Sequence, residues 1–142
     1  MAAKIFKVIW FVSLLAMMGV LVYCYASWPE AVYLNDANPP QTLGKSALFY
    51  AVMGLLAIFN MLAFVFPKLN YSDTFMAWFF GMLACLHFFL ISGITFVTTF
   101  NSMENYNYAN IGPLLYASFG LLSAWILAGP VVAVLSKKQA QN

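Results

Sequence analysis

Four long apolar stretches dominate this chain of 142 residues and limit what it can fold into. They cover residues 5–27, 47–66, 74–98 and 112–135, and Lys7 is the one Lys, Arg, Asp or Glu within them. A helix rises about 1.5 Å per residue, so each stretch is long enough to cross a hydrocarbon layer about 30 Å thick. Charged residues make up 7% of the chain, against about 25% in soluble domains. The sequence therefore predicts an integral membrane protein and excludes a soluble or disordered one.

The predicted architecture is all-α, a single four-helix transmembrane bundle over residues 1–142. Pro29 and Pro67 follow the first two stretches and Pro113 opens the last, positions at which proline ends or begins a helix. Residues 30–46, between the first two helices, are expected to form a polar loop.

A short motif, Tyr-Ala-x-x-Gly-Leu-Leu, occurs at residues 50–56 and again at 116–122, 66 residues apart. The repetition favours two tandem helical hairpins of the same orientation. Small residues let helix backbones approach closely in lipid. A packing role is therefore expected for the small residues of the motif, which are Ala51, Gly54, Ala117 and Gly120.

The lysines predict the orientation of the bundle, because cytoplasmic loops carry an excess of basic residues. If the amino terminus is cytoplasmic, five of the six lysines lie on that side and Lys45 alone lies on the other. Both termini are therefore expected in the cytoplasm. The chain has no arginine and no basic cluster, so nucleic-acid binding is not expected.

His87, the only histidine, lies near the middle of the third stretch. An ionisable side chain at this depth is a functional candidate, and two roles remain open. A neutral His87 could hydrogen-bond a neighbouring helix, with Ser123 at a similar depth. Alternatively, a partner chain could complete a haem or quinone site at His87. The chain itself offers no second histidine and no set of metal ligands, so no metal and no cofactor of its own is expected.

Two other polar residues, Asn60 and Ser13, lie within about one helical turn of each other in depth. Hydrogen bonds between helices in lipid contribute about 0.6 kcal/mol on average, and a structural role is expected for both. Cys24 and Cys85 fall inside apolar stretches, where thiols usually pack as small apolar groups.

The third loop is rich in asparagine and tyrosine, residue types that are favoured at protein contacts. It is a candidate partner surface through Asn105, Tyr106, Asn107 and Tyr108. The alternative is an ordinary aromatic belt at the membrane interface with solvated turns.

One resemblance lies in the first loop, in the run from Trp28-Pro29-Glu30 to Asp36, followed by Pro40, Gly44-Lys45-Ser46 and Leu48-Phe49-Tyr50. This pattern resembles the membrane domain of SdpI-like immunity proteins and related bacterial membrane proteins. Tyr33 and Leu34 stand where that family has a His-Phe pair. The resemblance implies a helical protein of the bacterial inner membrane with a peptide-sensing or immunity role.

The loops hold four acidic residues and neither histidine nor cysteine, too few groups for a nucleophile, a base and an orienting residue. An enzyme is therefore not expected. The leading hypothesis is a non-catalytic accessory or assembly subunit of an inner-membrane complex, in contact with lipid and with other subunits or a second copy. The alternatives are a peptide-immunity or sensing protein, and a haem- or quinone-linked redox subunit that uses His87.

Overall fold

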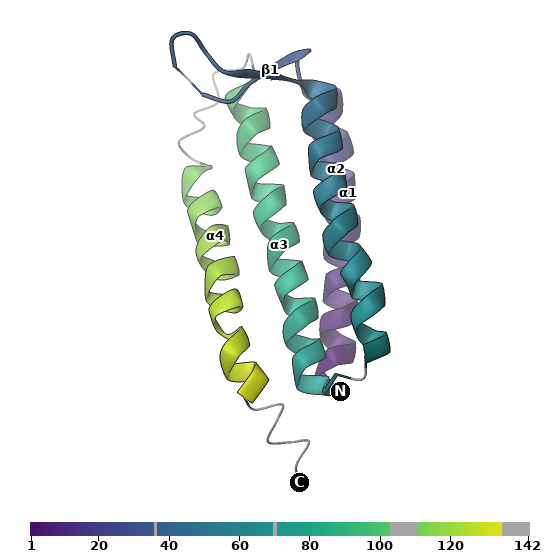
Figure 1. Ribbon diagram of the computed structural model, residues 1–142. Coiled ribbons are helices and arrows are strands. Elements are labelled where there is room, and N and C mark those ends of the chain that lie inside the picture. Colours follow the sequence, from purple (N-terminus) through teal and green to yellow (C-terminus); the bar gives the residue numbers. More distant parts are fainter. Residues whose placement is uncertain (36, 70, 103–110, 135–142) are drawn as a thin grey trace.

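The computed structural model describes residues 1–35, 37–69, 71–102 and 111–134, and four long helices dominate this part of the chain (Figure 1). The helices are α1 (Ala2–Ser27), α2 (Lys45–Val65), α3 (Asp73–Phe100) and α4 (Gly112–Leu127). A short 3-10 turn, η1 (Phe66–Leu69), follows α2, and helical turns continue α4 to Val134. All four are long and apolar enough to cross a membrane, which confirms the four predicted spans and indicates a membrane protein.

Helix α3 is the centre of the bundle, with α1 and α4 packed along different sides of it (Figure 1). The closest pair is α1 with α3, which are not neighbours in the sequence. Helix α2 lies beside α1 and α3 but its backbone approaches them at few points. The attachment of α2 to α1 and α3 therefore depends on long side chains that reach from one helix to the next.

Local sequence explains where the helices begin and end. Ser72 caps α3, because its hydroxyl accepts a hydrogen bond from the Phe75 backbone N–H at 3.2 Å. Pro113 lies in the first turn of α4, where its missing N–H costs no helical hydrogen bond. Helix α1 ends immediately before Trp28-Pro29, as the proline predicted.

The loop between α1 and α2 carries a small antiparallel ribbon, which the sequence did not predict. Strand β1 (Ala31–Tyr33) pairs with β2 (Thr42–Gly44), and Val32 lies opposite Leu43. The Val32 side chain is fully buried against the ends of the helices. An ion pair of 2.7 Å joins Glu30 to Lys45 and closes the ribbon at its base. The buried Val32 departs from the expected polar loop, because this part of the loop covers one end of the core.

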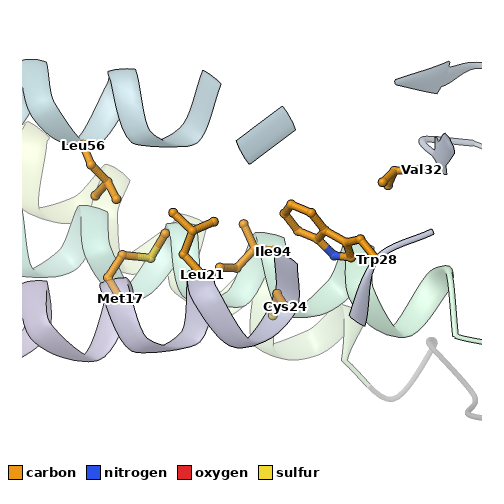
Figure 2. Close-up of a cluster of buried hydrophobic side chains, with 7 residues drawn as sticks. All are labelled: Met17, Leu21, Cys24, Trp28, Val32, Leu56 and Ile94. Carbon is orange, nitrogen blue, oxygen red and sulfur yellow. The ribbon is translucent and has the colours of Figure 1, made fainter. Parts of the chain in front are cut away.

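Two apolar clusters fill the interior. The cluster near the ribbon joins α1, α2 and α3 (Figure 2), and its buried members are Met17, Leu21, Cys24, Trp28, Val32, Leu56 and Ile94. The second cluster lies toward the start of α1, with buried members Trp10, Ala63, Met76, Phe79, Phe80 and Leu83. Between them lies a layer of polar side chains.

A reciprocal pair of tryptophans fastens α4 to α3. The Trp78 indole donates to the Trp125 carbonyl at 2.8 Å, and the Trp125 indole donates to the Trp78 carbonyl at 2.9 Å. Each ring also lies over a glycine of the other helix. A Cβ atom on Gly81 would collide with the Trp125 ring, and one on Gly129 would lie 2.8 Å from Trp78 Cζ2. Both glycines are therefore required by the close approach of a rigid ring.

We expect Gly81→Ala and Gly129→Ala each to lower the free energy of unfolding by about 1–3 kcal/mol, the usual cost of overpacking. The matched controls are Gly54→Ala and Gly120→Ala, because a Cβ atom at either position meets nothing within 4 Å. The free energy of unfolding of all four variants is measured in mixed detergent micelles. Equal stability of the two pairs would show that the tryptophan rings are not seated on these glycines.

Candidate functional site

The polar layer between the two clusters is centred on His87, whose side chain is fully buried. Ser13 of α1 lies with its Oγ 2.8 Å from His87 Nδ1. Asn60 of α2 lies with its Nδ2 3.1 Å from His87 Nε2. The Trp10 indole N–H donates to Asn60 Oδ1 at 2.7 Å. Four side chains from α1, α2 and α3 thus form one connected network, the His87 network.

The geometry fixes which atoms in the His87 network donate. Asn60 Oδ1 accepts from the Trp10 indole, which can only donate, so Asn60 Nδ2 is the amide nitrogen. One of its hydrogens goes to the Leu56 carbonyl at 2.8 Å and the other to His87 Nε2. Nε2 is therefore the acceptor, and a neutral His87 carries its proton on Nδ1.

The remaining hydrogens fit this assignment. Nδ1–H of His87 donates to Ser13 Oγ, and the Ser13 hydroxyl donates in turn to the Trp10 carbonyl at 2.8 Å. Every hydrogen of the side-chain N–H and O–H groups in the network then has an acceptor. A doubly protonated imidazole would direct Nε2–H at the Asn60 NH₂ group, where two donors would face each other. The network therefore holds His87 neutral.

This arrangement restricts the chemistry open to His87. A histidine binds haem iron or another metal through an unprotonated ring nitrogen, and here that atom accepts from Asn60. A ligand at Nε2 would have to displace the amide and leave a buried N–H without a partner, which is costly. Among the described residues, no group of three or more His, Cys, Asp or Glu could hold a metal ion.

The structure brings together three of the residues that the sequence singled out: His87, Asn60 and Ser13. Ser123 is not a partner, because Ser13 and Asn60 take both ring nitrogens of His87. The expected His87–Ser123 hydrogen bond is therefore wrong. Similar depth does not specify which side of a helix a residue faces, and His87 faces α1 and α2 rather than α4. The role of Trp10 was not predicted from the sequence, because its place near a membrane boundary is typical of an aromatic belt.

The four small residues of the repeated motif do not lie at helix contacts among residues 1–35, 37–69, 71–102 and 111–134. Ala51, Gly54, Ala117 and Gly120 are all exposed, and a Cβ atom on either glycine would meet nothing within 4 Å. The expectation that they pack neighbouring helices of the same chain is wrong. The bundle instead makes its tightest contacts with glycine at Gly81 and Gly129.

The remaining candidates are two cysteines and four loop residues. Cys24 and Cys85 are buried free thiols. The candidate partner residues Asn105, Tyr106, Asn107 and Tyr108 lie outside the described part of the chain.

Comparisons of this chain with protein-family models, with curated proteins and with solved structures find no match.

We expect Asn60→Leu to lower the free energy of unfolding by about 1–2 kcal/mol, because it removes two interhelical hydrogen bonds and leaves the buried Trp10 indole N–H unpaired. Met61→Leu is the matched control on the adjacent position, where the side chain is 68% exposed. Unfolding of both variants in mixed micelles measures the difference. The assignment of Asn60 to the network would be contradicted if the two variants were equally stable.

Proposed function

We propose that this chain is a non-catalytic accessory or assembly subunit of a bacterial inner-membrane protein complex. The single observation that carries the proposal is the exposure of the repeated motif on two helices, at Ala51 and Gly54 of α2 and at Ala117 and Gly120 of α4. Small residues in lipid favour close approach between helices. Since no helix in the described part of the chain covers them, these two faces are open to helices of another protein or of a second copy.

The interior of the bundle supports a role without chemistry. The His87 network links its own donors and acceptors, and His87 has no free ring nitrogen. The Trp78 and Trp125 indoles bind each other's carbonyls. A haem- or quinone-linked function at His87 is therefore disfavoured, because it would require the network to open.

The limited burial of α4 points the same way. Its buried residues over Gly112–Leu127 are Ser118 and Leu122, whereas α3 buries ten of its residues. Phe119 and Tyr116 are exposed on α4 beside the repeated motif, at 57% and 76%. An apolar, aromatic and largely uncovered helix at the edge of a bundle suits contact with lipid and with a partner helix.

We infer that both termini face the cytoplasm. The Met1 amino group lies 2.9 Å from Asp73, so the start of α1 and the start of α3 share one end of the bundle. Lys4, Lys7 and Lys68 belong to the helix ends gathered there. A concentration of lysines at one end supports a cytoplasmic location for that end.

The proposal predicts that the chain migrates in a particle larger than its monomer after mild solubilisation of native membranes. Gly54→Leu combined with Gly120→Leu should lower the amount of chain found in that particle at least about tenfold. A leucine on either face keeps a partner helix at a distance. The same double variant should retain the heat stability of the parent in detergent, since no described residue covers either glycine.

Gly19→Leu is the matched control, because Gly19 is also uncovered but lies on α1 outside the motif. Blue native electrophoresis with an antibody to a tag measures the particle size of the parent, the double variant and Gly19→Leu. A monomer-sized parent would refute the proposed subunit role. A parent complex that survives the double variant would refute the assigned faces.

A further inference from the structure

A cavity of about 860 Å³ opens between the ends of α1 and α3, at the ribbon end of the bundle. Apolar and aromatic side chains from α1 and the turn after it line one side of the cavity, and they include Val20, Cys24 and Trp28. Helix α3 contributes a row of threonines at its last turns. Small-molecule sites typically span about 300–1,000 Å³, so the cavity has room for a headgroup together with the first part of its acyl chains.

The wall of the cavity offers mainly hydrogen-bond acceptors. The hydroxyl groups of Ser27, Thr98, Thr99 and Ser102 each donate their hydrogen to a backbone carbonyl of their own turn, at 2.7–3.0 Å. The Thr98 oxygen also accepts from the Trp28 indole at 2.7 Å. Lone pairs on the Ser27 and Thr99 oxygens therefore remain for a ligand that donates.

Asn101 contributes no further donor to the cavity. Its Nδ2 hydrogens go to the Tyr33 and Val97 carbonyls, at 3.0 and 2.8 Å. Its Oδ1 accepts from the Tyr33 backbone N–H at 2.7 Å. The Asn101 amide therefore links the end of α3 to β1 by hydrogen bonds, and it is not available to bind an anion.

Two hydroxyl groups on the cavity wall differ from the rest. Within the described part of the chain, the hydroxyls of Tyr23 and Thr95 have no hydrogen-bond partner, so each can donate or accept. None of the described residues that line the cavity is Lys, Arg, Asp, Glu or His. A charged headgroup would therefore meet no counter-charge on this described wall, whereas an alcohol can both donate and accept there.

We propose that this cavity binds a neutral lipid whose headgroup carries free hydroxyl groups, of the diacylglycerol or glycosyl-diacylglycerol class. Its hydroxyls bond the Ser27, Thr95 and Thr99 oxygens at the ends of the helices. Its acyl chains descend from the cavity over Val20 along the apolar side of α1. The cavity lies at the end of two membrane-spanning helices, which is the depth of lipid headgroups. This inference does not rest on the proposed subunit role.

Native mass spectrometry of the full chain in detergent tests the site with three probes: dioleoylglycerol, trioleoylglycerol and dioleoylphosphatidylglycerol. Dioleoylglycerol should bind at least about fivefold more tightly than trioleoylglycerol, the factor that corresponds to one net hydrogen bond. Dioleoylglycerol should also bind more tightly than the anionic dioleoylphosphatidylglycerol. Equal binding of all three would overturn the selection by hydroxyl groups, and binding of free glycerol as tightly as dioleoylglycerol would overturn the lipid assignment.

Substitutions in the cavity wall test where dioleoylglycerol binds. Thr95→Val and Thr99→Val each keep the shape of the side chain but remove a hydroxyl from the wall, and each should weaken dioleoylglycerol about fivefold. Thr42→Val in β2 is the matched control, because this residue lies outside the cavity lining. Val20→Trp should abolish binding by filling the cavity. Unchanged binding in Val20→Trp, or an equal loss in Thr42→Val, would overturn the site.

Discussion

The bundle depends on a small set of hydrogen bonds at its middle, where His87 of α3 meets Ser13 of α1 and Asn60 of α2. Apolar contacts alone have little power to choose one arrangement of helices in lipid, since lipid tails are as apolar as leucine. A buried donor or acceptor without a partner costs more than a single apolar contact contributes. The network therefore penalises any rotation or sliding of α1 and α2 that separates these groups.

This constraint matters most for α2, whose backbone approaches the other helices at few points. Asn60 binds His87 on one side and the Trp10 indole on the other, so it connects α2 to both neighbours. Helix α4 is held by a different device, the reciprocal Trp78 and Trp125 indoles. The two devices both act on α3, which explains why α3 is the most buried of the four helices.

The sequence predicted the helices well because long apolar runs and prolines are local signals. It also identified His87, Asn60 and Ser13 as polar residues that needed partners. It could not predict their meeting, because the rotation of a helix about its axis is set by packing. The same limit explains the error at Gly54 and Gly120, where residue type suggested contact but the described helices cover neither. The α1–α2 ribbon was missed because its three-residue strands are too short to show an alternating pattern.

The protonation of His87 tests the network most directly. The chain has one histidine, so ¹⁵N-labelled histidine gives a single imidazole spectrum in the folded protein. The hydrogen-bond geometry predicts a neutral ring at pH 7 with the proton on Nδ1 and with Nε2 unprotonated, seen in the ¹⁵N shifts and in the couplings of each nitrogen to the ring protons. A proton on Nε2 would contradict the network, because that atom would then face the Asn60 amide donor.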